Sequence, residues 1–378
     1  MFHPHHLILP VPLDDRLCLD CPENHRAMNS IVTFPIQKTT MRYLSTLILS
    51  LLIIGCGEYH EREAATVVSA LECDYNKFST PGDYQSGGVQ MIDLIEGYKV
   101  WTKRYGNSPM KVLILHGGPA GTHEYLESFQ SFFPQANIEF YEYDQLGSYY
   151  SDQPTDMSLY TIERFVEEVE QVRIALGLNK DNFVLLGQSW GGILAMEYAL
   201  KYQEHLKGLI VCNMTADFHK YAAYNNKLRE QLRPSLVDTF QMYEDAEDYG
   251  NPIYLELVEK EFYAKHICKI YPFPEPVARS FSHFNGPVYS YMQGPSEFVP
   301  GGILKDWSVW DRLHEIATPT LMVGAEYDSM NPDEMKEMAT LVQNGESLHC
   351  PNGSHLALWD DQEVFMEGVV GFIHRIFR

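Results

Sequence analysis

A strand that turns directly into a helix around a serine is the feature that most constrains this sequence. Residues 182–200 read NFVLLGQSWGGILAMEYAL, in which an apolar run ends at Gly187 and a helix-like run begins at Gly191. So sharp a turn needs glycines beside Ser189 to avoid backbone clashes, and the spacing Gly-x-Ser-x-Gly is that of a nucleophile elbow. Such a turn projects the serine hydroxyl beyond the edge of a parallel sheet, where ligands bind in open α/β folds. The pattern therefore predicts a nucleophilic serine, provided that the rest of the chain supplies the sheet and the partners of the serine.

The segments around this turn alternate between strands and helices. Short buried strands are expected at 111–115, 138–143, 182–186, 206–212, 319–324 and 347–350, and helices at 161–176, 191–202, from 332 and from 362. A hairpin around Gly97 precedes them. Strands and helices that alternate through short loops predict an α/β fold with a mostly parallel central sheet and right-handed crossovers.

The alternation is interrupted between Asn213 and Pro319. Residues 214–312 are rich in Tyr, Glu, Lys and Pro and read as mostly helical. We therefore expect an α/β core formed by residues 86–213 and 313–378, with residues 214–312 inserted between two strands as a helical cap. A cap over the sheet edge would admit only small substrates or the ends of peptides.

A serine hydroxyl is a weak nucleophile without a base and an orienting carboxylate. In a sheet of this type the partners follow in the order serine, acid, histidine. Asp328 follows the strand at 319–324, and His355 lies in the loop after the strand at 347–350, so both are expected beside Ser189. The rivals are Glu326 or Asp333 for the acid and, for the base, His349, which sits inside a strand.

Two backbone amides are expected to bind the oxyanion that forms during attack. The amide of Trp190, the residue after the nucleophile, points to where the oxyanion forms. A second donor comes from the loop after the third strand, which reads His116-Gly117-Gly118-Pro119. Gly118 is the preferred donor and Gly117 the alternative, whereas His116 is expected to support the loop and not to act as a base.

Composition excludes several classes of function. The chain has 378 residues with 45% hydrophobic and 21% charged residues, as globular proteins do, and a net charge of −23. That charge repels a phosphate backbone, so no nucleic-acid partner is expected. Cys18-x-x-Cys21 has no second ligand pair for zinc, and Cys73, Cys212, Cys268 and Cys350 are few and widely spaced, unlike a disulfide framework. The expected chemistry needs neither a metal nor a cofactor.

The N-terminal region resembles a targeting segment and not part of a fold. Residues 41–55 combine a cationic start with an apolar run, as secretory signals do, and Cys56 follows Ile-Ile-Gly as in a bacterial lipobox. We expect lipidation of Cys56 and a tether over residues 56–85, with the protein held in the bacterial cell envelope, facing the periplasm or the cell surface. An uncleaved N-terminal anchor is the alternative. Residues 1–40 are expected to be a non-native or upstream extension, with translation starting at Met41 or Met28.

Five segments, in this order, resemble the proline iminopeptidase family of the α/β-hydrolase fold. They are HGGPA at 116–120, YDQLGS at 143–148, GQSWGG at 187–192, GAEYD at 324–328 and GSHLALWDD at 353–361. The insertion also resembles the cap of this family, in FYAKHICKIYPFPEPV and GPSEF. The resemblance implies a serine aminopeptidase that removes an N-terminal residue, often proline, from short peptides or aminoacyl amides without a cofactor. It further implies that Glu297 of GPSEF binds the free α-amino group of the substrate.

The sequence departs from the family pattern at two positions. The branch that includes the tricorn-interacting aminopeptidase has a second glutamate directly after the triad aspartate, where this chain has Ser329. A serine carries no charge to pair with an ammonium, which keeps open an amidase or esterase acting on small amides, esters or lactones with the same triad. A catalytically inactive lipoprotein that binds peptides or glycans is a rival of another class. Ala120 replaces a glycine of the family motif, which we expect to matter little.

Seven aromatic residues of the cap are expected to pack in the core more than to line a substrate pocket, namely Tyr254, Phe262, Tyr263, Phe281, Phe284, Tyr289 and Tyr291.

Overall fold

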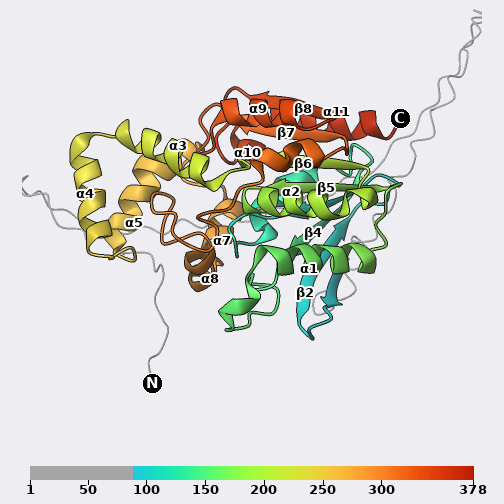
Figure 1. Ribbon diagram of the computed structural model, residues 1–378, viewed down its shortest axis with the longest axis horizontal. Coiled ribbons are helices and arrows are strands. Elements are labelled where there is room, and N and C mark those ends of the chain that lie inside the picture. Colours follow the sequence, from blue (N-terminus) through green and yellow to red (C-terminus); the bar gives the residue numbers. More distant parts are fainter. Residues whose placement is uncertain (1–87) are drawn as a thin grey trace, which may run out of the picture. The chain divides into compact units, whose positions relative to one another are not determined.

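A single eight-stranded sheet organises the chain. The computed structural model describes residues 88–378. The strands lie in the order β1-β2-β4-β3-β5-β6-β7-β8, with β1 and β2 antiparallel to their neighbours and all other pairs parallel (Figure 1). Their bounds are β1 Val89–Asp93, β2 Lys99–Tyr105, β3 Lys111–Leu115, β4 Glu139–Asp144, β5 Phe183–Gln188, β6 Gly208–Cys212, β7 Thr320–Ala325 and β8 Gly345–Cys350. The mostly parallel sheet and the hairpin before it are confirmed.

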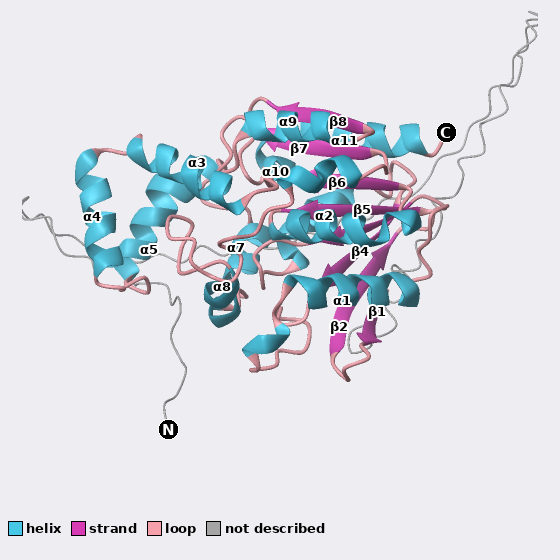
Figure 2. Ribbon diagram, in the orientation of Figure 1, coloured by secondary structure: helices cyan, strands magenta, loops and turns pink. Residues whose placement is uncertain are grey.

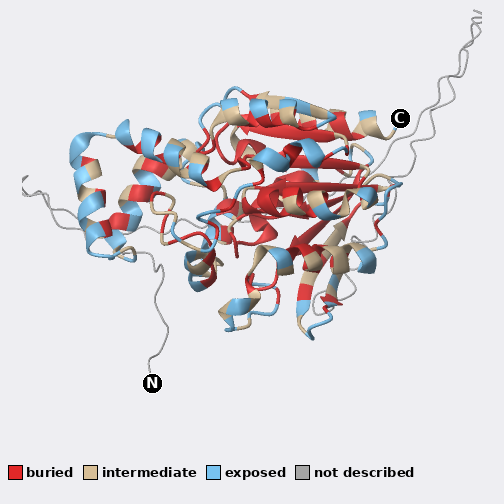
Figure 3. Ribbon diagram, in the orientation of Figure 1, coloured by how far each residue is buried: buried red, intermediate tan, exposed pale blue. Residues whose placement is uncertain are grey.

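Helices cover both faces of this sheet, so its central strands are buried on both sides (Figures 2 and 3). Alternate residues of β3 serve two different cores: Leu113 and Leu115 pack in one, Val112 and Ile114 in the other. This explains why the buried strands read as continuous apolar runs. The first core includes α1 Ile162–Ala175, α2 Trp190–Tyr202 and α9 Pro332–Leu341, and the second α10 Ala357–Asp360, α11 Gln362–Ile376 and the 3₁₀ helix His123–Ser131.

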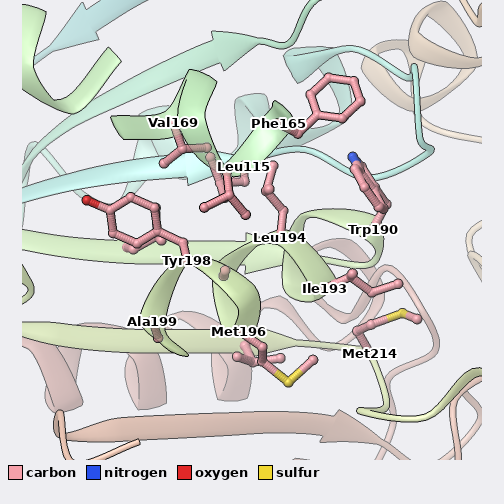
Figure 4. Close-up of a cluster of buried hydrophobic side chains, with 14 of the residues drawn as sticks. Leu115, Phe165, Val169, Trp190, Ile193, Leu194, Met196, Tyr198, Ala199 and Met214 are labelled. Atoms are coloured by element: carbon pink, nitrogen blue, oxygen red, sulfur yellow. The ribbon is translucent and has the colours of Figure 1, made fainter. Parts of the chain in front are cut away.

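Helix α2 is apolar on nearly every side, as a helix enclosed by other elements must be. Figure 4 shows its residues Leu194, Met196 and Tyr198 among side chains from α1 and β3. At one end of the same cluster lie Trp190 and Ile193. The helix that follows the serine is thus fixed along its whole length by packing.

The residues between β6 and β7 are mostly helical, as the sequence indicates. They form α3 Phe218–Glu230, α4 Pro234–Asp245, α5 Pro252–Val258, a π-helical turn Glu259–Tyr263, α6 Ala264–His266, α7 Glu275–Ser282 and α8 Gly286–Met292, followed by a 3₁₀ helix Trp310–Glu315. Helices α3 to α5 project from the core in Figure 1. An isolated bridge between Asp217 and Ser308 joins the two ends of this insertion. None of the helices within residues 88–378 is long and apolar enough to cross a membrane.

Candidate active site

Ser189 lies in the turn between β5 and α2 with φ 57° and ψ −128°. A positive φ is rare for a residue other than glycine and stores strain, which is common where a side chain must be presented for chemistry. A Cβ on Gly187 would lie 2.0 Å from the carbonyl oxygen of Gly191, and one on Gly191 would lie 2.1 Å from that of Leu115. Only glycine fits at these two positions, so the glycines are required by the turn itself.

Asp328 and His355 follow β7 and β8, at the same edge of the sheet as Ser189. His355 Nδ1 lies 2.8 Å from Asp328 Oδ1. The buried carboxylate also accepts hydrogen bonds from Asn213 Nδ2, at 2.7 Å, and from the amide of Met330, at 3.0 Å. Since Nδ1 is held by the carboxylate, Nε2 is the nitrogen of His355 left to serve the serine.

The surroundings of His355 make it a stronger base. Burial lowers the pKa of a histidine, because the charged imidazolium loses its hydration, whereas the charge of Asp328 and its hydrogen bond raise the pKa. The carboxylate prevails, so the pKa of His355 lies above its ordinary value. A raised pKa suits a group that must take a proton from a serine hydroxyl.

A hydrogen-bonded chain links the three loops around Ser189. The amide of Gly117 donates to Tyr125 Oη at 2.6 Å, and that hydroxyl donates to Gln188 Oε1 at 2.6 Å. Gln188 Nε2 in turn donates to the carbonyl oxygen of His355 at 2.9 Å. Tyr125 and Gln188 were not anticipated as site residues, and they fix the loop of Gly117, the elbow and the histidine loop relative to one another.

The insertion also holds the loop that carries His355. The amide of His355 donates to the carbonyl oxygen of His266 at 3.0 Å, and that of Leu356 to Ile267 at 2.8 Å. Asp360 accepts from the amide of Ser354 and from the amide of Lys269, each at 2.9 Å. The segment after the π-helical turn is therefore part of the scaffold of the histidine.

The loop after β3 distinguishes the two candidate oxyanion donors. Because Gly117 gives its amide to Tyr125, Gly118 remains as the donor that the loop can offer beside Trp190. Gly118 has φ +125°, and a Cβ there would lie 2.5 Å from the amide nitrogen of Gly121. Ala120 has φ 59°, a left-handed conformation that costs an alanine about 1 kcal/mol and that a glycine adopts freely.

The residues that rivalled Asp328 and His355 as acid and base interact with other side chains. His349 Nε2 pairs with Glu326 Oε2 at 3.3 Å, and Asp333 pairs with Lys336 at 3.3 Å. His116 accepts a hydrogen bond from the amide of Gln145 at 3.1 Å and contacts Gly117, so it supports its loop as expected.

Two chambers meet at Ser189. The larger, which we call the vestibule, has a volume of about 310 Å³ and lies between the core loops and the insertion. The smaller, the inner chamber, has a volume of about 20 Å³. Gly118, Ser189 and Glu297 line both chambers, and the wall of the inner chamber is completed by Trp190, Ile193, Met214, Tyr221, Gln293 and Met330.

Glu297 lies at the junction of the two chambers and is held there by two phenols. Tyr289 Oη donates to Glu297 Oε1 at 2.6 Å, and Tyr221 Oη donates to Glu297 Oε2. Gln293 Nε2 lies 3.2 Å from Tyr221 Oη. A carboxylate that lines the same chambers as the serine can accept hydrogen bonds from the primary or secondary ammonium group of a substrate.

Ser329 does not take the place of a second acid in the site. It is buried, its Oγ has no hydrogen-bond partner among the described residues, and its carbonyl oxygen accepts from Asn225 Nδ2 at 3.1 Å. It lines neither chamber. Glu297 is therefore the only acidic side chain among the described residues that line the two chambers.

The expectation for the cap aromatics was right for some of them and wrong for others. Phe262 is a core residue, but the vestibule is lined by Tyr254, Tyr263, Phe281, Phe284 and Tyr289. Some side chains that pack the helices of the insertion together, such as Tyr254, also form the wall of the vestibule. No cluster of three or more His, Cys, Asp or Glu that could hold a metal occurs in residues 88–378.

Comparison with known proteins agrees with this geometry. Residues 111–362 match the family described as alpha/beta hydrolase fold. The proline iminopeptidase of Elizabethkingia meningoseptica is 57% identical over 282 residues, which cover 74% of this chain and 95% of that protein. The crystal structure of VinJ has a TM-score of 0.72 at 31% identity, covering 76% of this chain and 98% of VinJ. That of the proline iminopeptidase of Mycobacterium smegmatis has a TM-score of 0.70 at 29% identity, with coverage of 76% and 98%. This chain therefore belongs to the proline iminopeptidase family of the alpha/beta hydrolases.

Proposed function

We propose that this chain is a serine aminopeptidase that releases an N-terminal residue, proline or another small or apolar residue, from short peptides. The observation that carries the proposal is the position of Glu297, a carboxylate that lines both chambers together with Ser189. A free N-terminal amine bound there places the first carbonyl group of a peptide close to the serine. The relatives named proline iminopeptidase support the same reaction.

The mechanism follows from the arrangement of the loops. Ser189 attacks the carbonyl carbon of the N-terminal residue while His355 takes the hydroxyl proton and Asp328 stabilises the imidazolium. The amides of Trp190 and Gly118 bind the oxyanion. His355 then donates the proton to the departing amine, which leaves an acyl-enzyme on Ser189. Water activated by His355 hydrolyses this ester and releases the free amino acid.

The inner chamber favours a small first residue. Its volume of about 20 Å³ is little more than one water-sized group requires. Its wall is mostly apolar, with Trp190, Ile193 and two methionines. A compact first residue suits this space better than a large side chain, which would have to displace more of the wall.

An amidase or esterase with the same triad is the second candidate, and Ser329 is the observation that favours it. With a serine that lines neither chamber, one carboxylate alone would anchor the amine. Prolyl-arylamide and its N-acetylated form separate the two functions. An aminopeptidase should reject the blocked amine, whereas equal rates would favour the amidase or esterase.

Replacing Glu297 tests the amine anchor directly. For Glu297→Gln we expect kcat/KM for prolyl-arylamide to fall roughly 100-fold, because an ammonium buried beside the amide loses its charged partner. Hydrolysis of the N-acetylated substrate should not fall, because it has no charge to bind. Glu256→Gln, which removes an exposed acid from α5 of the same insertion, is the matched control and should behave as the wild type. An equal loss for both substrates in Glu297→Gln would contradict the anchor.

The N-terminal segment adds a location to the proposal. Residues 41–55 read as a lipoprotein-type signal and Cys56 as its lipidated residue, and both lie outside the described residues. On this basis the enzyme is anchored by lipid in the bacterial cell envelope, facing the periplasm or the cell surface. In a bacterial host, Cys56→Ser should move the protein from the membrane to the soluble fraction and abolish labelling by palmitate. Cys73→Ser should change neither, and membrane retention of Cys56→Ser would favour an uncleaved anchor.

A further inference from the structure

The position of His355 assigns the two halves of a substrate to the two chambers. His355 lines the vestibule and is not among the described residues that line the inner chamber. The histidine that accepts the serine proton must afterwards protonate the leaving group, so the leaving group must lie within its reach. The departing part of the substrate therefore occupies the vestibule, and the acyl residue occupies the inner chamber.

The vestibule offers an apolar surface to that departing part. Its volume of about 310 Å³ is that of a site for a small ligand. The insertion contributes Leu255, Val258, Ile267, Val277, Phe281 and Phe284 to its wall. Leu255 is 41% exposed and Phe281 is 38% exposed, so two large apolar side chains of this wall remain in contact with water. Such side chains at the rim of a cavity are expected where an apolar ligand covers them.

The same wall offers no cationic side chain to a carboxylate. The described residues that line the vestibule include no lysine or arginine, and their one acid is Glu297. Arg279, which lies on α7 beside lining residues, is already paired with Glu124 at 3.1 Å and Glu127 at 2.7 Å. A free dipeptide would bring its terminal carboxylate into this apolar space near another negative charge. That placement is costly because the carboxylate loses its hydration without gaining a cationic partner.

We propose that the vestibule is a subsite for an apolar, preferably aromatic, leaving group that carries no carboxylate of its own. This inference rests on the proposed aminopeptidase function and specifies its substrates. The second residue of a good substrate is aromatic or aliphatic, and its carboxyl group is blocked as an amide or continues into a longer chain. Free dipeptides are poor substrates even when their first residue is proline.

Three substrates that share an N-terminal proline test the subsite in the full-length protein. We expect kcat/KM for prolylphenylalanine amide to exceed that for prolylglycine amide roughly 10- to 100-fold, as the burial of an aromatic side chain allows. It should exceed that for the free dipeptide prolylphenylalanine by about 10-fold or more. Equal values for all three would overturn the subsite while leaving the aminopeptidase function intact. Faster cleavage of phenylalanylglycine amide than of prolylphenylalanine amide would reverse the assignment of the chambers and overturn it as well.

A pair of charge variants on α5 distinguishes the effect of a charge inside the vestibule from the effect of the overall charge of the protein. Leu255→Arg places a cation in the vestibule wall and should raise the ratio of kcat/KM for the free dipeptide to that for its amide roughly threefold to fivefold. Ile253→Arg adds the same charge to the same helix at a residue that is 56% exposed and does not line the vestibule, so it should leave the ratio unchanged. An unchanged ratio in Leu255→Arg, or an equal rise in both variants, would overturn the proposal. If N-acetylated amides are cleaved but no proline amide is, the proposed aminopeptidase function itself is wrong, and this outcome differs from a failure of the subsite alone.

Discussion

Replacement of Ser189 by alanine is expected to lower turnover of prolyl-arylamide by about 10⁴-fold or more, to the level that binding and the oxyanion donors alone sustain. The variant should fold as the wild type does. Ser189 gives no side-chain hydrogen bond to cap α2, and an alanine at φ 57° is strained about as much as the serine. The backbone of the turn is set by Gly187 and Gly191, which the substitution leaves in place.

The measurement pairs kinetics with labelling by a fluorophosphonate probe. The wild type should be labelled, and Ser189→Ala should be neither labelled nor active, with an unchanged melting temperature. Turnover retained above a few per cent in a folded variant would contradict the assignment of the nucleophile. A folded wild type that resists the probe would favour the catalytically inactive lipoprotein.

The parts of the site that local sequence determines could be predicted. A strand, a tight turn and a helix leave few choices around Ser189, and residues after parallel strands gather at one edge of the sheet. Asp328 and His355 were therefore expected in the same region, and their side chains lie 2.8 Å apart. The rival His349 could be set aside because it lies within β8 and not in the loop after it, and its ring pairs with Glu326.

The partners of these residues depend on contacts between distant segments and could not be read in the same way. Tyr125 and Gln188 are 63 positions apart and meet only because the loop after β3 lies against the end of β5. Asn213 donates a hydrogen bond to Asp328, and one feature of the sequence indicates a role for it: it is a polar residue directly after the buried strand β6. Such a residue at the edge where ligands bind is a candidate that sequence reasoning could have named.

The vestibule was missed for a different reason. Aromatic residues in a helical insertion fit a core and a pocket wall equally well, because both need large apolar side chains. Tyr254 illustrates the difficulty: it is buried among the helices of the insertion and lines the vestibule as well. Only the placement of the insertion over Ser189 distinguishes the two roles, and that placement depends on tertiary contacts.

Replacement of Asp328 by asparagine is expected to lower kcat by about 10⁴-fold with the fold retained, since the imidazole loses both its orientation and its stabilising charge. The pH dependence gives a second and independent readout. His355 must be neutral to act as a base, so activity is lost as the pH falls through its pKa. Because Asp328 raises that pKa, the acid limb of kcat/KM in the wild type should lie above the ordinary histidine value of about 6.5.

Asp328→Asn should move this limb to lower pH, because burial then lowers the pKa of His355 without the opposing charge of Asp328. Profiles of kcat/KM between about pH 5 and 9 measure both effects. Glu326→Gln is the matched control, because this neighbouring acid is half exposed and pairs with His349, so neither rate nor limb should change. An acid limb that stays in place in Asp328→Asn would mean that another group, and not His355, accepts the serine proton. A large loss in Glu326→Gln would instead move the role of the acid two residues along the same loop.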